Sequence, residues 1–84
     1  MKEYLKAVTA LKRVCDLISR GSDMPCSTVQ FCIEDFETEF KKQFDQAIGA
    51  QSVIETLEQA KIACREQGTA KMVELLNKIN VFVT

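Results

Sequence analysis

Apolar residues recur every three or four positions along this chain, in four stretches that glycine or proline separates. Gly21, Pro25, Gly49 and Gly68 all fall between these stretches. A spacing of three to four residues is typical of amphipathic helices, and glycine and proline are the residues that most often interrupt them. The alternation typical of a β-strand persists nowhere for more than a few residues. The pattern therefore predicts four helices, near 3–20, 28–48, 53–67 and 70–82.

Each predicted helix has an apolar stripe along one face. The stripe of the first helix consists of Tyr4, Val8, Leu11, Cys15 and Ile18, and that of the second of Val29, Ile33, Phe36, Phe40, Phe44 and Ala47. The third helix has Val53, Leu57, Ala60 and Cys64, and the fourth Met72, Val73, Leu75, Leu76 and Ile79. Such stripes are buried against neighbouring helices. They predict an all-α fold, a small four-helix bundle with two antiparallel long helices and a C-terminal helical hairpin, in one domain, 1–84.

Side chains able to cap a helix stand where three of the helices are expected to begin. Ser27 with Gln30, and Ser52 with Glu55, have the spacing of a capping box, in which the two side chains satisfy backbone N–H groups at the helix start. Thr69 precedes the fourth helix in the same way. We therefore expect these three residues to cap the second, third and fourth helices.

The length and charge of the chain limit the classes of function. A core built from only 84 residues leaves about 3–5 kcal/mol of net stability, so self-association would help the fold. The net charge of −1 disfavours bulk attraction to nucleic acid or to an anionic membrane. Basic residues concentrate in the first helix and acidic residues in the second, which suits two helices that pack with complementary flanks.

Residue types needed for most catalysis and metal binding are missing or badly spaced. The chain has no histidine, no Gly-rich phosphate loop and no cysteine pair with the spacing of a zinc site. We expect Cys15 and Cys64 to act as small hydrophobic residues and Cys26 to be the most accessible thiol. The paired carboxylates of Glu34 with Asp35 and of Glu37 with Glu39 are expected on a solvated face. The sequence thus predicts no enzyme, no metal and no cofactor.

Nothing in the sequence indicates membrane insertion or secretion by a signal peptide. No stretch approaches the roughly 20 apolar residues that span a bilayer. Charged side chains, among them Lys2, Glu3 and Lys6, interrupt the N-terminal segment where a signal peptide would be apolar. We therefore expect a cytoplasmic protein.

One face of the first helix carries a row of cations. With about 100° between successive residues, these side chains fall opposite the apolar stripe, with one leucine at their border. The face consists of Lys2, Lys6, Arg13, Leu17 and Arg20. It is either an ordinary solvated face or a site for an acidic partner or a small anionic ligand.

Several apolar residues lie where a helix of an isolated domain would be polar. Phe31 points away from the ridge of the second helix, and Ile62 lies among glutamates on the third. The chain also ends on an apolar tail, Val81, Phe82 and Val83, where most domains are polar. A large exposed aromatic residue is typical of interfaces, so these five residues form the predicted partner interface.

Taken together, these features predict a non-enzymatic protein-binding module that forms a homodimer. A small regulator, inhibitor or secretion-type chaperone that also binds an unidentified protein would fit. The first alternative is a binder of a small, nucleotide-like anion on the basic face. The second is a helix-turn-helix nucleic-acid binder built from 53–82, which Glu74 disfavours because it stands where that motif needs an apolar residue.

Overall fold

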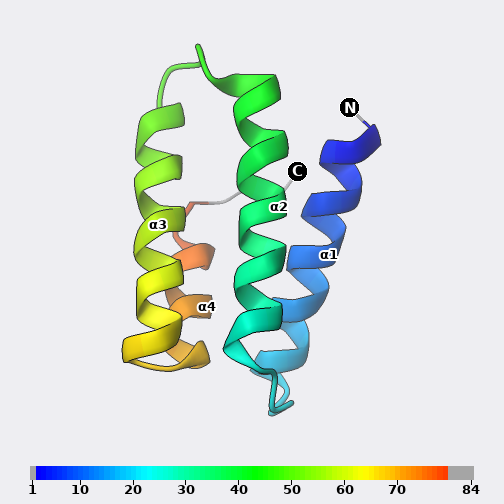
Figure 1. Cartoon of the computed structure of the whole chain (residues 1–84), viewed down its shortest axis with the longest axis vertical. Coiled ribbons are helices and arrows are strands. Elements are labelled where there is room, and N and C mark those ends of the chain that lie inside the picture. Colours follow the sequence, from blue (N-terminus) through cyan, green and yellow to red (C-terminus); the bar gives the residue numbers. More distant parts are fainter. Residues whose placement is uncertain (1, 80–84) are drawn as a thin grey trace.

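The computed structural model describes residues 2–79, and these form four helices joined by short loops (Figure 1). The described residues contain no strand, so the predicted all-α class is confirmed. The helices are α1 (Lys2–Ser19), α2 (Cys26–Phe44), α3 (Ala50–Glu66) and α4 (Thr69–Asn77). Each overlaps one of the four predicted segments, because the apolar period that predicted it is the period that buries one of its faces.

Three of these helices begin earlier than their serine and threonine residues predict. The residue before each helix is Pro25, Gly49 or Gly68, and none has a side-chain cap. The carbonyl of Pro25 already accepts bonds from the backbone N–H groups of the residues three and four positions later, at 3.1 and 3.2 Å. Ser27 and Ser52 therefore lie inside the first turn, and the predicted capping boxes are wrong.

The second helix ends at Phe44, four residues before its predicted end. A row of residues spaced by four drifts about 40° per step around a helix, because four residues exceed one turn of 3.6. After Phe36, Phe40 and Phe44, the next residue in the row no longer points at the core. Ala47 and Ile48 instead lie in the loop, where both are exposed.

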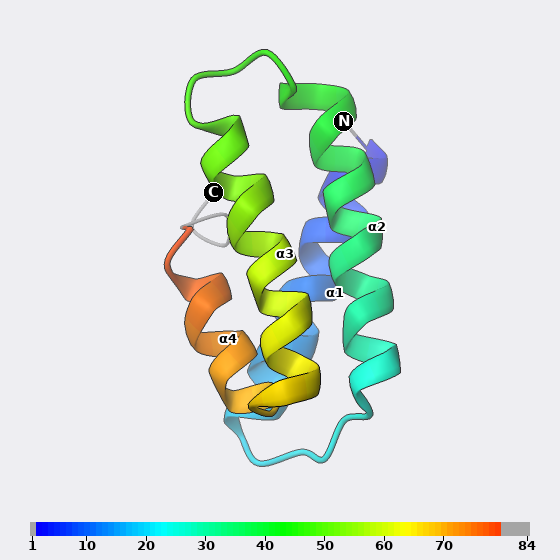
Figure 2. The ribbon, with the colours of Figure 1, turned by 60° about the vertical axis from the view of Figure 1, so that its left-hand side comes forward.

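Each helix packs against two others around a common core. Contacts join α1 to α2, α2 to α3, α3 to α4, and α4 back to α1. Figure 2 shows α3 and α4 side by side, with α1 behind them. The start of α1 lies beside the end of α2, since the ring of Tyr4 packs edge-on against that of Phe44 with centroids 5.3 Å apart.

The core contains residues from all four helices. Its largest side chains without solvent exposure are Val29, Ile33 and Phe36 from α2, Leu11 from α1, Leu57 from α3, and Met72 and Leu76 from α4. The aromatic rings of Phe36, Phe40 and Phe44 stack in series along α2, with centroids 5.8 and 5.2 Å apart. This ridge was predicted from its four-residue spacing. Tyr4 of α1 packs against this ridge, with its ring centroid 5.7 Å from that of Phe36.

Candidate functional site

The outer face of α1 has a shallow depression, largely open to solvent, between its long cationic side chains. Among the described residues, the hollow is lined by Lys2, Leu5, Lys6, Thr9, Ala10 and Arg13, and its volume is about 400 Å³. The hollow exists because the small residues Thr9 and Ala10 lie midway along a face whose other side chains are long. We call this set of six residues the α1 hollow.

The α1 hollow is both basic and apolar. Leu5 is 57% exposed at its wall although it is a large apolar residue. Lys2, Lys6 and Arg13 form no ion pair with any residue between 2 and 79. Three unneutralised cations beside an exposed leucine could bind a partner that carries both carboxylates and an apolar side chain.

The basic face predicted from the sequence is only partly one site. Lys2, Lys6 and Arg13 line the α1 hollow, but Leu17 and Arg20 do not. Arg20 lies at the other end of the helix, where its Nε atom is 3.2 Å from Oδ2 of Asp16 in an exposed ion pair. Helical periodicity groups residues by angle alone, so it could not separate the two ends of an 18-residue helix.

Phe31 projects from α2 among acidic side chains. It is 71% exposed, as its position opposite the phenylalanine ridge predicts. A second, smaller hollow of about 190 Å³ is lined by Phe31, Glu34, Asp35 and Thr38. We call these four residues the Phe31 patch. It combines an aromatic ring with two carboxylates, the complement of the α1 hollow.

The remaining residues of the predicted interface do not join the Phe31 patch. Ile62 is 46% exposed but lines a different hollow, between α3 and α4, together with Leu75 and Lys71. Val81, Phe82 and Val83 lie outside the described residues. Leu5 was missed by the sequence reasoning, although its angle on the helix, well away from the apolar stripe, could have identified it.

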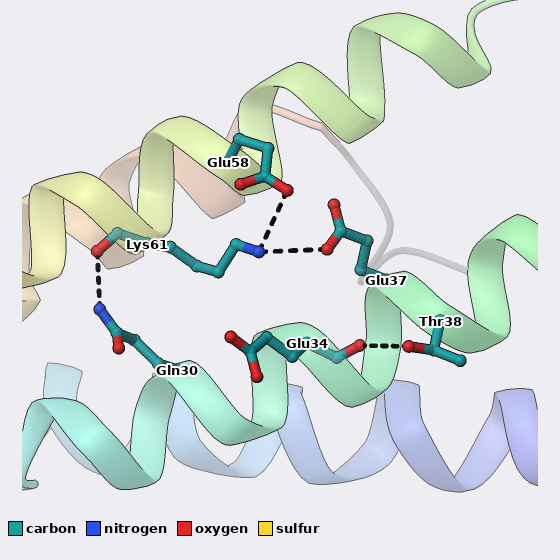
Figure 3. Close-up of polar contacts among 6 residues, drawn as sticks. All are labelled: Gln30, Glu34, Glu37, Thr38, Glu58 and Lys61. Atoms are coloured by element: carbon teal, nitrogen blue, oxygen red, sulfur yellow. Dashed lines mark hydrogen bonds and ion pairs between the residues drawn. The ribbon is translucent and has the colours of Figure 1, made fainter.

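A polar cluster connects α2 to α3 on the flank of α2 that faces α3 (Figure 3). The Nζ atom of Lys61 lies 3.2 Å from Oε1 of Glu37 and 3.1 Å from Oε1 of Glu58. Gln30 donates a hydrogen bond from Nε2 to the backbone oxygen of Lys61, at 3.0 Å. Glu37 is buried, which contradicts the solvated position expected for it, because α3 covers this side of α2.

The electrostatics of this cluster favour the charged forms of Lys61 and Glu58. Burial alone would lower the pKa of Lys61, but hydrogen bonds to Glu58 and Glu37 outweigh it and raise that pKa above its usual value. The hydrogen bond from Lys61 is the main cause of a lowered pKa at Glu58. The cluster holds a protonated lysine between two carboxylates. A lysine held protonated in this way is a structural cation and a poor base.

Two cysteines for which the sequence predicted no pairing are bonded to each other in the structure. Cys26, at the start of α2, is joined by a disulfide bond to Cys64, near the end of α3, with Cα atoms 6.0 Å apart. The prediction that Cys26 is an accessible thiol is therefore wrong, whereas Cys64 is buried in the apolar core as predicted. The two helix ends meet only through the fold, because the cysteines are separated by 38 positions in sequence.

The other two cysteines are free thiols of low reactivity. Burial raises the pKa of Cys15 to about 11, with a further contribution from the nearby Cys32. Burial also raises the pKa of Cys32, and the charge of Asp35 adds to the effect. Because the thiolate is the reactive form, both side chains are weak nucleophiles at neutral pH.

No group of metal-ligating side chains occurs within residues 2–79. None of the four described helices is long and apolar enough to cross a membrane. Comparison with protein-family models, with curated proteins and with solved structures finds no match to this chain. The functional argument therefore rests on the two surface features, the α1 hollow and the Phe31 patch.

Proposed function

We propose that this protein is a non-enzymatic protein-binding module that self-associates, and that it acts as a small regulator, inhibitor or secretion-type chaperone. Its proposed scaffold is a small four-helix bundle, with α1 and α2 antiparallel and α3 and α4 as a hairpin. The contact of Tyr4 with Phe44 supports the first arrangement. The two-residue break between α3 and α4 supports the second.

The observation that carries the proposal is the exposure of Phe31 within a regular helix. A loop aromatic can fold back over the core, but α2 continues for thirteen residues beyond Phe31 and keeps its ring outside. Burying a phenylalanine side chain is worth about 1.5–3 kcal/mol, and Phe31 gains most of this only from a partner. Aromatic side chains on a rigid surface are typical anchors of protein interfaces.

We also propose the cytoplasm as the compartment. Glutathione and thioredoxin would there keep Cys26 and Cys64 mostly as thiols, and the disulfide would form under oxidising conditions. The pairing of these cysteines lies at the contact of α2 with α3, away from the cations of α1. Binding through α1 and the outer face of α2 is therefore compatible with either redox state.

The two alternatives differ in their support. A small anionic ligand would use the same cations as the α1 hollow, and their lack of ion-pair partners among the described residues favours it. A nucleic-acid binder would need cations along α4. In α4, the Nζ atom of Lys71 lies 3.3 Å from Oε1 of Glu74, and this ion pair neutralises the charge of Lys71. We therefore keep protein binding as the proposed function.

Substitution of Phe31 by serine tests the proposal. We expect wild-type protein to form dimers in native mass spectrometry and sedimentation velocity, and Phe31→Ser to weaken the dimer because it removes the apolar anchor. Circular dichroism should report unchanged helicity, since the ring lies outside the core. Ile48→Ser is the matched control, because Ile48 is an even more exposed apolar residue, on the loop after α2. A dimer equally stable in both variants would contradict the role of Phe31.

A further inference from the structure

We propose that the partner of the α1 hollow is the Phe31 patch of a second copy of this chain. The inference rests on the proposed function and assigns the surface through which the module self-associates. The dimer would contain two such contacts, one from each α1. Each copy would thus contribute a basic hollow and an acidic aromatic patch.

Charge complementarity is the first argument for this occupant. The α1 hollow contains the cations Lys2, Lys6 and Arg13, and the Phe31 patch contains the carboxylates of Glu34 and Asp35. Neither carboxylate is in an ion pair with any residue of the described chain. One molecule thus carries two surfaces of opposite charge, and neither is neutralised by ion pairs within the described chain. An interface between two copies would bring these surfaces together.

The exposure of Phe31 and the lengths of the two surfaces also allow them to meet. The α1 hollow contains exposed small residues, Thr9 and Ala10, between longer neighbours, so its floor is open to a ring. Phe31 stands out from α2 as the side chain that would enter it. With a rise of about 1.5 Å per residue, the hollow extends about 16 Å along α1 and the Phe31 patch about 10 Å along α2. The patch therefore fits within the length of the hollow.

The packing of α1 against α2 allows both contacts to form at once. The start of α1 lies beside the end of α2, as the contact between Tyr4 and Phe44 requires. A two-fold axis parallel to this helix pair would place α1 of each copy against α2 of the other, with the two helices running in opposite directions. Such an interface is self-complementary and closes at two copies, so it predicts a dimer and no longer assembly.

Charge reversal on each surface, followed by mixing, tests this pairing. The first variant is Lys6→Glu with Arg13→Glu, and the second is Glu34→Lys with Asp35→Lys. Each faces like charges at both contacts of its homodimer. We expect its dissociation constant to rise roughly 100-fold or more. The mixture restores opposite charges at both contacts, so a heterodimer should form when the two variants are combined.

The control variant is Arg65→Glu with Lys78→Glu, which makes the same change of charge at exposed positions in α3 and directly after α4. It should dimerise like wild type. Circular dichroism checks that each variant is folded. If a reversed variant loses helicity, its neutral counterpart, such as Lys6→Gln with Arg13→Gln, replaces it and should weaken the dimer and reduce its dependence on salt.

The outcomes separate the docking surface from the proposed function. Monomeric variants that form a heterodimer on mixing would support the pairing. A dimer that survives charge reversal, or variants that stay monomeric after mixing, would overturn the pairing but leave self-association in place. A wild-type protein that is monomeric throughout would overturn self-association itself, and a different protein would then be the occupant.

Discussion

Lys61 joins two carboxylates where α2 and α3 meet. Its side chain is only 13% exposed, and Glu37 beside it is buried, with Oε2 accepting no hydrogen bond within the described residues. A buried ion pair adds little to stability by itself, because both charges have lost their hydration. The same lost hydration makes either charge costly when its partner is removed.

We therefore expect Lys61→Met to destabilise the protein by about 3 kcal/mol, because it leaves the Glu37 carboxylate buried without a counter-charge. Chemical denaturation followed by circular dichroism measures this loss. The double variant Lys61→Met with Glu37→Met removes both charges and should recover most of the stability. If the single substitution costs no more than the double one, Glu37 does not depend on Lys61.

The burial of Glu37 could not be predicted from the sequence. Periodicity identified the apolar stripe of α2 correctly, because every apolar residue of the stripe within the helix packs into or against the core. Glu37 stands at the edge of that stripe, where its exposure depends on which neighbour covers the flank. The position of α3 determines whether Glu37 is exposed, and the local sequence pattern does not predict that position.

Among the helices, the periodic interiors were predictable and the ends were less so. The apolar period spans many residues, so the existence of α1 to α4 follows from it. A helix end depends on a few backbone bonds, and Pro25, Gly49 and Gly68 start the helical bonding before the polar residues that were expected to cap it. For the same reason the meeting of Cys26 with Cys64 could not be predicted, since it needs two correct helix ends and their packing.

The bond between Cys26 and Cys64 should stabilise the contact of α2 with α3. Closing a loop between residues 38 positions apart restricts the unfolded chain by about 4 kcal/mol in the chain-entropy treatment. We expect the oxidised protein to unfold at higher denaturant concentration than the same protein in reducing agent. The double variant Cys26→Ala with Cys64→Ala should be insensitive to the reducing agent. A wild-type protein equally stable in both conditions would show that the bond contributes nothing.

The proposed binding depends on the surface of the whole molecule and not on its core. The fold places the basic face of α1 and the acidic face of α2 on neighbouring helices, and each keeps an apolar side chain, Leu5 or Phe31, in solvent. The sequence pattern predicted the basic face of α1, the acidic residues of α2 and the exposure of Phe31, but it did not predict the exposure of Leu5. It could not indicate that Thr9 and Ala10 leave a hollow, because a hollow depends on the lengths of all side chains around it.

Zero-length cross-linking with a carbodiimide tests whether the α1 hollow of one copy contacts the Phe31 patch of another. This reagent joins a lysine amine to a carboxylate only when the two are in contact. Mixing ¹⁵N-labelled and unlabelled protein distinguishes bonds between copies from bonds within one chain. Lys61 with Glu58, 3.1 Å apart, supplies the internal control and should give cross-links with a single label.

We predict mixed-label cross-links that join Lys2 or Lys6 of one copy to Glu34 or Asp35 of the other, and their loss in Phe31→Ser. Such bonds would place the basic hollow of one molecule on the acidic patch of its partner. Mixed-label cross-links confined to other surfaces, or none while the internal control reacts, would contradict the pairing of the α1 hollow with the Phe31 patch.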